Sequence, residues 1–284
     1  MDYTKKSKKI LIANKESIIC GWNIIKKISK RYRTEIIPLD SEHFSIYKLT
    51  QNYKDNEIDK IYITASGGPF LRLPFKKFSK IRPKDALKHP KWKMGKKISI
   101  DSATLMNKIL ELIEAQKIFP FSRNKYEIII HPQSLVHAIV KFKNGLTNFL
   151  YHEPDMAIPI SNAIFNIKNN INEFSYLNKF TNKKIKNLEF LKVEKKRFPV
   201  MRLIPKLNKH PSASIIINAS NEILVDQFLK RKISFNSIIR HLFSVLRDKN
   251  YKKYAIQVPS NLKKIYMIDK WSREITLQKL KIRN

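Results

Sequence analysis

The stretch ILIANKESIICGWNIIKKISKRYRTEIIPL, residues 10–39, decides how this chain begins to fold. It starts with a short apolar run over 10–13, and Ser17 then stands where it can cap a helix that continues to about Lys30. A second apolar run follows over 34–39. Two short strands joined by a helix make a βαβ unit, which is part of a doubly wound domain rather than a domain in itself.

The middle of the chain continues with alternating strand and helix patterns. A strand over 58–65 leads into Ser66-Gly67-Gly68, and a strand over 98–101 leads into a helix over 103–119. Three more strands are expected, at 126–130, 135–142 and 146–151. Asn144-Gly145 joins the last two and indicates a hairpin with a type I′ turn. These patterns predict a central α+β unit with an antiparallel sheet edge.

The C-terminal part has a helical pattern. Residues 166–191 are polar and poorly periodic, which is typical of a linker. Beyond it, helices are expected over 212–230, 235–248 and 261–280, the last with Ser260 as its N-cap after Pro259. The predicted fold class is therefore α/β and α+β. It has four parts: a remnant of a doubly wound domain (1–39), a central α+β domain (40–165), a linker (166–191) and a C-terminal helical bundle (192–284).

Composition limits the classes of partner. The formal net charge is +34 over 284 residues, which would ordinarily suggest nucleic acid or an anionic membrane. However, the chain has 45 lysines and only 12 arginines, spread from end to end without a basic block. Nucleic-acid readers favour the bidentate contacts of arginine, so this excess fits the composition bias of an AT-rich genome better. We therefore expect neither nucleic acid nor a membrane as partner.

Redox and targeting signals are sparse. Cys20 is the single cysteine, so neither an internal disulfide nor a cysteine zinc cluster is possible. The first nine residues are charged and no window approaches 18 uninterrupted apolar residues, so the cytoplasm is the expected location.

Three acidic residues are candidate metal ligands. Asp40 and Glu42 stand two apart at the end of a predicted strand, so both carboxylates should point to one side and suit Mg²⁺ or Mn²⁺. Glu111 should share a helix face with Asn107 and Lys108. The alternatives to a metal site are a solvated strand end for Asp40 and Glu42 and an exposed Lys-Glu pair for Lys108 and Glu111.

Two short stretches could hold phosphate. Ser66-Gly67-Gly68 offers a hydroxyl and unobstructed backbone N–H groups after a strand, although a plain turn is the alternative. Ser102 and Thr104 stand at the predicted start of a helix, where free N–H groups favour an anion, although ordinary capping is the alternative. Residues 89–95 lie between the two stretches. They are either a substrate lid or a locally packed loop.

Taken together, these residues resemble the 1-deoxy-D-xylulose 5-phosphate reductoisomerase family. The resemblance runs through most of the chain in order. The matching segments are Leu11-Ile12-Ala13-Asn14-Lys15-Glu16-Ser17, Asp40-Ser41-Glu42-His43, Ser66-Gly67-Gly68-Pro69-Phe70, His89-Pro90-Lys91-Trp92-Lys93-Met94-Gly95, Asp101-Ser102-Ala103-Thr104, Met106-Asn107-Lys108, His131-Pro132-Gln133-Ser134, Glu153-Pro154-Asp155-Met156 and, more weakly, Asn218-Ala219-Ser220-Asn221-Glu222.

The resemblance implies an activity. Such an enzyme rearranges 1-deoxy-D-xylulose 5-phosphate and reduces the product with NADPH to 2-C-methyl-D-erythritol 4-phosphate, in non-mevalonate isoprenoid biosynthesis. It also implies a homodimer formed through the central sheet, and a divalent metal, Mn²⁺ or Mg²⁺, held by Asp40, Glu42 and Glu111.

The resemblance also implies roles for individual residues. The implied catalytic residues are Lys15, Glu42, His89 and Glu111. The implied substrate contacts are Lys15, Ser41, Glu42, Ser66, His89, Ser102, Asn107, Lys108 and Glu111, and the residues beside the nicotinamide cofactor are Asn14, Glu16 and Gly95. The loop carrying Trp92 and Met94 would close over the substrate.

The sequence departs from the family pattern in three places. Members begin with a domain whose Gly-rich turn holds the NADPH pyrophosphate, whereas this chain has five glycines and no Gly-x-Gly. His152 and Ala157 stand where Gly and a basic residue are expected. We therefore expect the first 39 residues to be the remnant of that NADPH-binding domain, and the chain by itself not to turn over substrate with NADPH. The alternatives are an inactive remnant that binds metal and phosphosugar, and a basic protein recruited to nucleic acid.

Overall fold

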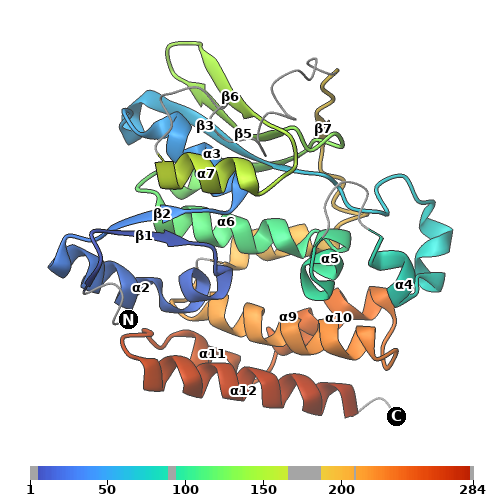
Figure 1. Ribbon diagram of the computed structural model, residues 1–284. Helices are drawn as coiled ribbons and strands as arrows, with labels where there is room; N and C mark the ends of the chain where they lie inside the picture. Colours follow the sequence, from blue (N-terminus) through green and yellow to red (C-terminus); the bar gives the residue numbers. More distant parts are fainter. Residues whose placement is uncertain (1–5, 89–93, 166–186, 208, 282–284) are drawn as a thin grey trace. The chain divides into compact units, whose positions relative to one another are not determined.

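The computed structural model of the protein describes residues 6–88, 94–165, 187–207 and 209–281 (Figure 1). The chain forms two compact units. The first, which we call the sheet unit, contains Met1–Asn14, Lys27–Ser66 and Ile118–Val193. The second, which we call the helical unit, contains Lys15–Lys26, Gly67–Lys117 and Glu194–Asn284.

The sheet unit contains two parallel strands and a five-stranded mixed sheet. The parallel pair is β1 (Lys9–Ile12) and β2 (Glu35–Pro38), in the register Lys9 with Glu35. The order in the larger sheet is β6-β5-β3-β4-β7, in which β3 runs parallel to β4 and antiparallel to β5. Its strands are β3 (Ile58–Ala65), β4 (Tyr126–Ile130), β5 (Val136–Phe142), β6 (Thr147–Tyr151) and β7 (Leu191–Lys192).

Two helices complete the core of the sheet unit. Helix α3 (Ser41–Thr50) contacts β2, β3, β5 and β6, and α7 (Ala157–Phe165) contributes Ala163 to the same apolar cluster (Figure 1). Ile37, Leu39 and Phe44 are the other buried members of that cluster. The end of β2 and the start of α3 are therefore fixed by apolar burial.

The helical unit is built around helix α9. Helix α9 (Ala213–Leu229) contacts α5, α10 and α12, and most of its side chains are buried. The other α-helices are α4 (Pro83–Ala86), α5 (Lys96–Ala103), α6 (Met106–Ile118), α10 (Phe235–Val245), α11 (Tyr251–Ala255) and α12 (Leu262–Lys281). Helix α2 (Lys15–Tyr32) lies between β1 and β2 in sequence, and its first part, up to Lys26, belongs to this unit.

An aromatic cluster holds the segment after Gly68. Phe70 meets Phe235 edge to face with ring centroids 5.2 Å apart, and Phe78, in the 3-10 helix Phe75–Lys80, lies 6.3 Å from Phe235. The Arg197 guanidinium donates to the backbone oxygens of Phe70, at 2.8 Å, and Leu73, at 2.7 Å. The segment from Phe70 to Phe78 is therefore packed in place.

Several predicted boundaries were wrong for local reasons. Helix α2 begins at Lys15, so Ser17 lies inside it rather than capping it. Residues 98–101 lie in helix α5, not in a strand, because four residues of alternating polarity fit either structure and burial of Ile100 and Asp101 selects the helix. The cap of α12 is Asn261, whose Oδ1 accepts from the amide of Lys264 at 2.9 Å, and not Ser260.

The predicted hairpin is present with a different turn. The amide of Gly145 donates to the oxygen of Phe142 at 3.2 Å, and Gly145 adopts a φ of +91°. Asn144 keeps a negative φ, so the turn is not type I′, which requires two consecutive residues with positive φ.

The C-terminal pattern is confirmed for the three main helices, with differences of no more than three residues at either end. Most of the predicted linker, 166–186, lies outside the described residues, and its last residue, Leu191, pairs with β4 as part of β7. Among the described residues, no helix combines the length and apolarity needed to cross a membrane.

Candidate metal and substrate site

The first pair of candidate ligands lies at the start of α3. Asp40 is its N-cap, and Ser41 and Glu42 occupy the first turn, where the Ser41 hydroxyl donates to Glu42 Oε2 at 2.6 Å. The two acids are therefore brought together by a helix start and not, as predicted, by alternation along a strand, since β2 already ends at Pro38. The positive end of the helix dipole favours carboxylates at this position.

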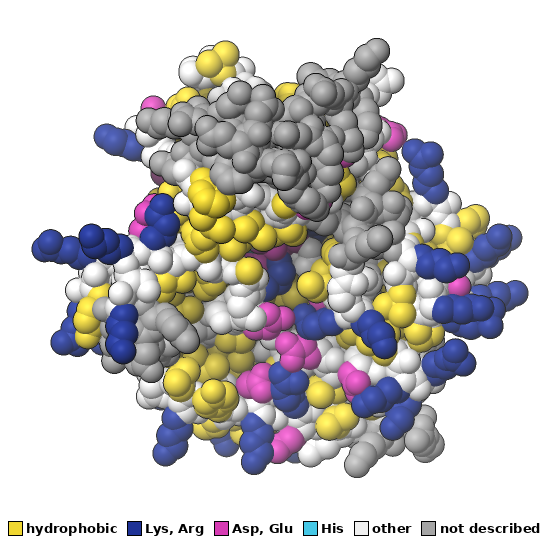
Figure 2. Space-filling model, viewed as in Figure 1, with side chains coloured by type: hydrophobic (Ala, Val, Ile, Leu, Met, Phe, Trp, Pro, Cys, Tyr) yellow, Lys and Arg dark blue, Asp and Glu magenta, His cyan; other side chains and the backbone are white. Residues whose placement is uncertain are grey.

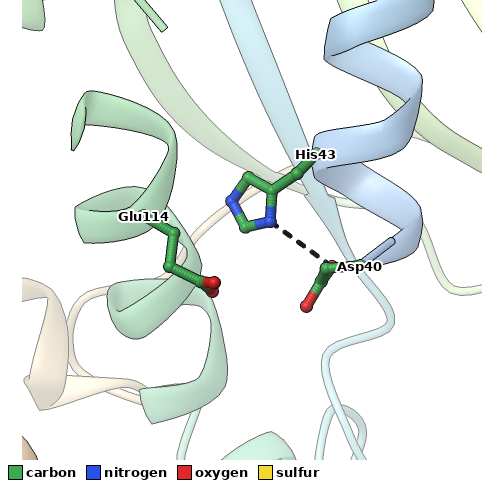
Figure 3. Close-up of side chains that lie close together, drawn as sticks. All are labelled: Asp40, His43 and Glu114. Carbon is green, nitrogen blue, oxygen red and sulfur yellow. Dashed lines mark ion pairs between the residues drawn. The ribbon is translucent and has the colours of Figure 1, made fainter. Parts of the chain in front are cut away.

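His43 supports Asp40 from one turn further along α3. Its ring is fully buried and stacks on Phe119, with centroids 6.5 Å apart. Its Nδ1 lies 3.7 Å from Asp40 Oδ1 (Figure 3). The sequence showed His43 next to the acids without assigning it a role.

The third candidate ligand lies on α6 among cationic groups. The Lys108 ammonium donates to Glu111 Oε2 at 2.5 Å, and the Asn107 amide donates to Glu111 Oε1. Lys15, at the start of α2, places its Nζ 3.8 Å from Glu111 and 2.9 Å from Glu114. Glu111 and Lys108 are buried, so the three residues predicted to share a helix face do so, and an exposed Lys-Glu pair is excluded.

A second, partly buried ion pair lies on α5 and contacts α2 and α9. Asp101 accepts from Lys97 at 3.1 Å and from the Asn221 amide at 2.7 Å, and Lys97 also contacts Glu16 at 3.4 Å. Burial, the largest influence, raises the pKa of Asp101. Burial alone would lower the pKa of Lys97, but Asp101, Glu16 and Glu222 together more than offset this and the pKa of Lys97 is raised. The surrounding carboxylates thus fully compensate the desolvation of Lys97, whereas the partners of Asp101 compensate only part of its desolvation.

The predicted glycine turn follows β3 directly. Gly67 and Gly68 have φ values of +79° and +65°, which favour glycine. A Cβ on Gly68 would stand 2.8 Å from the backbone oxygen of Ser102. Gly68 therefore allows the turn to touch the end of α5, and the two candidate phosphate holders Gly68 and Ser102 lie together.

The helix-start argument for Ser102 and Thr104 was wrong. Ser102 lies in the last turn of α5 and Thr104 is its C-cap, where free carbonyl groups rather than N–H groups point outward. The helix start in this region belongs to α6, which begins at Met106 and carries Asn107 and Lys108 in its first turn.

The remaining predicted residues are spread over several places. Asn14 is exposed just before α2, Glu16 lies in its first turn, Gly95 is the exposed N-cap of α5, and Ser66 is half-buried after β3. His89 and Trp92 lie outside the described residues, as does most of the proposed lid.

Sequence reasoning missed Glu114, Lys97 and the role of Asp101. Glu114 could have been found, because it lies seven residues after Asn107 and three after Glu111 on the same helix face. Lys97 and Asp101 also have helical spacing, but that signal was lost when their segment was assigned to a strand.

The surface of the molecule carries dispersed positive charge. Figure 2 shows Lys and Arg side chains around the whole visible face rather than in one patch. This agrees with the even spread of lysine along the sequence.

Comparison with known proteins gives a consistent result. Residues 36–119 match the model of the 1-deoxy-D-xylulose 5-phosphate reductoisomerase C-terminal domain, and residues 152–275 match that of the DXP reductoisomerase C-terminal domain. The 1-deoxy-D-xylulose 5-phosphate reductoisomerase of Pelagibacter ubique is 48% identical over 271 residues, covering 93% of this chain and 68% of that protein. That of Wolbachia pipientis wMel is 45% identical, covering 85% of this chain and 62% of that protein, so the chain spans less than two thirds of some relatives.

Solved structures show the same relationship. A DOX-P reductoisomerase in complex with NADPH, fosmidomycin and magnesium aligns with a TM-score of 0.88 at 33% identity, over 98% of this chain and 71% of that one. The Zymomonas mobilis enzyme in complex with NADPH aligns with a TM-score of 0.83 at 29% identity, over 98% and 69%. With a relative 48% identical over more than two thirds of its length, the chain belongs to the 1-deoxy-D-xylulose 5-phosphate reductoisomerase family.

Proposed function

We propose that this protein carries out the NADPH- and metal-dependent conversion of 1-deoxy-D-xylulose 5-phosphate to 2-C-methyl-D-erythritol 4-phosphate in non-mevalonate isoprenoid biosynthesis. Family membership supports the reaction. The observation that carries it for this chain is the buried Glu111, surrounded by Lys15, Lys108 and Asn107, which are residue types that bind a metal and a phosphorylated sugar.

Asp40, Glu42 and Glu111 would hold the divalent ion. The set fits a hard cation because all three offer carboxylate oxygens, which suit Mn²⁺ or Mg²⁺. When bound, such an ion supplies Lewis-acid polarisation of adjacent ketone and hydroxyl oxygens. Glu42 and Glu111 would also orient those oxygens.

The substrate phosphate and sugar would be held by cationic and hydroxyl side chains. The Lys108 ammonium would supply charge to the phosphate, and Ser66, Ser102 and Asn107 would contact it. Lys15 would contact the reacting part of the sugar. The full proposed set of substrate contacts is Lys15, Ser41, Glu42, Ser66, His89, Ser102, Asn107, Lys108 and Glu111.

The nicotinamide cofactor would lie against Asn14, Glu16 and Gly95. The exposed Gly95 fits this role, because among the described residues nothing lies within 4 Å of a Cβ placed there. NADPH supplies the hydride for the reduction. Lys97 contacts Glu16 at 3.4 Å and so helps to fix its carboxylate.

The proposal extends to assembly and location. A homodimer formed through the sheet unit is supported by the edge position of β6 and by the exposed Phe149 on that strand. We place the protein in the cytoplasm and keep the four-part domain division as a prediction.

Calorimetry with Mn²⁺ and 1-deoxy-D-xylulose 5-phosphate tests the proposal. The protein should bind the phosphosugar far more tightly with Mn²⁺ than without it. Glu111→Gln should weaken Mn²⁺ binding about tenfold or more while leaving the fold intact, because one ligand loses its charge but keeps its shape. Glu127→Gln is the control, since Glu127 pairs with Lys60 on β3. Equal Mn²⁺ affinity in the Glu111 variant and the unaltered protein would contradict the assignment, and binding without turnover would support the binding-only alternative.

A further inference from the structure

Lys15 lies between two carboxylates of one helix. Its Nζ is 2.9 Å from Glu114 Oε2 and 3.8 Å from Glu111 Oε1. The exposed fractions of these side chains are 13% for Lys15 and 1% for each glutamate. Glu111 and Glu114 are three residues apart on α6, so they follow one another along the same face.

The two glutamates differ in the other groups around them. Glu111 also accepts from Lys108 at 2.5 Å and from the Asn107 amide. A metal ion that binds Glu111 must therefore compete with ammonium groups for the same oxygens. In a poorly solvated site this competition is strong, because opposite charges interact more strongly there than in water.

We propose that Glu114 is a positioning residue for Lys15. Its carboxylate holds the ammonium by the shorter contact, which keeps Lys15 from a full ion pair with Glu111 and so weakens one of the competitors of the metal for the Glu111 oxygens. It also keeps the Lys15 ammonium in place for the substrate. This inference rests on the proposed function, in which Glu111 is a metal ligand and Lys15 contacts the sugar.

The geometry explains why the arrangement needs a second carboxylate. A lysine side chain is long and flexible, and its ammonium accepts any nearby anion as a partner. If Glu114 loses its charge, Glu111, whose Oε1 lies 3.8 Å from the Lys15 ammonium, is a charged acceptor within its reach. The metal then meets a stronger competitor, although none of its own ligands has changed.

A double-mutant cycle tests this in the full chain. Mn²⁺ affinity is measured by calorimetry for the unaltered protein, Glu114→Gln, Lys15→Met and the double variant. We expect Glu114→Gln to raise the Kd for Mn²⁺ by about tenfold, and to change it less than about twofold in the Lys15→Met background, because the two residues act as a coupled pair. Glu114→Asp keeps the charge and should recover part of the affinity.

Glu222→Gln is the matched control. It removes one negative charge from a helix of the same unit, where Glu222 pairs with Arg273 at 2.5 Å, and it should leave Mn²⁺ affinity unchanged. Circular dichroism and the thermal midpoint of each variant check that the fold persists.

The cycle separates the possible failures. If Glu114→Gln raises the Kd for Mn²⁺ equally with and without Lys15, Glu114 acts on the metal directly or only through the fold, and the inference is overturned. If Glu114→Gln leaves the Kd unchanged in both backgrounds, Glu114 has no positioning role and the inference is overturned as well. If the unaltered protein fails to bind Mn²⁺, the proposed function fails and the inference with it. Mn²⁺ binding with an additive cycle overturns the inference alone.

Discussion

At the scale of single residues, burial decides what a titratable group can do. His152 stacks on His137 with centroids 3.8 Å apart, and both rings are buried. His152 Nδ1 donates to the oxygen of Glu153 at 2.7 Å, which fixes the neutral tautomer, and His137 Nε2 donates to the oxygen of His152 at 3.2 Å. A charge on the His152 ring would face the His137 ring with little water to solvate it.

This pair predicts a pH dependence of stability. Burial lowers the pKa of His152 below 6.5, so the unfolded chain binds more protons than the folded protein between the two values. The free energy of unfolding should therefore be highest above pH 6.5 and fall as the pH drops below it, with His152 contributing up to about 1.4 kcal/mol per pH unit. Urea denaturation from pH 7.5 down to pH 5 measures the slope.

His152→Phe keeps an aromatic ring and should flatten the slope. His210→Phe, in the helical unit, controls for the loss of a histidine. An unchanged slope in His152→Phe would show that other groups cause the acid sensitivity.

At the scale of elements, the site depends on how a turn meets a helix end. Gly68 brings the turn after β3 against the last turn of α5, at a distance that a side chain would not allow. Phe70 and Arg197 then hold the segment that follows. The glycine turn is therefore a point of close approach between two elements and more than a change of chain direction.

Gly68→Ala should cost more stability than Gly145→Ala. Both glycines have positive φ, so alanine strains either position by about 1–2 kcal/mol. Only at Gly68 would the new Cβ meet backbone, 2.8 Å from the oxygen of Ser102, whereas nothing lies within 4 Å at Gly145. Denaturant titration of the two variants isolates the contact. Equal losses of stability in the two variants would mean that the turn moves away from Ser102 without further destabilising the protein.

At the scale of the whole molecule, the proposed ligands come from distant parts of the sequence. Asp40 and Glu42 lie at the start of α3, and Glu111 lies on α6. A metal that binds the folded protein and not the unfolded chain stabilises the fold by its free energy of binding.

Mn²⁺ should therefore slow amide exchange near its proposed ligands. At a concentration 100 times its Kd, the ion should stabilise the protein by about 2.7 kcal/mol. Exchange should slow at the start of α3 and at the start of α6, and Glu42→Gln and Glu111→Gln should each reduce both effects. Protection confined to one of these two helices would contradict a ligand set that includes Asp40, Glu42 and Glu111.

Most strands and the long C-terminal helices could be predicted from the sequence. Strands β3 and β4 have the predicted bounds, and α9, α10 and α12 lie within a few residues of theirs. The reason is that apolar periodicity over many residues reports burial directly. The predictions for short segments were wrong. Residues 98–101 are too few to show a helical or strand period. Helix α3 was missed because Asp40 and Glu42 were assigned to the end of a strand.

The sequence by itself determined the family, the mixed fold class and the residue types of the candidate site, because those depend on order and spacing along the chain. Only the tertiary structure decided that Asp40 begins a helix, that Gly68 touches Ser102, and that Lys15 lies between Glu111 and Glu114. The Lys15–Glu114 pair joins residues 99 positions apart in sequence. Such a contact depends on how α2 and α6 pack, and no local pattern in the chain records it.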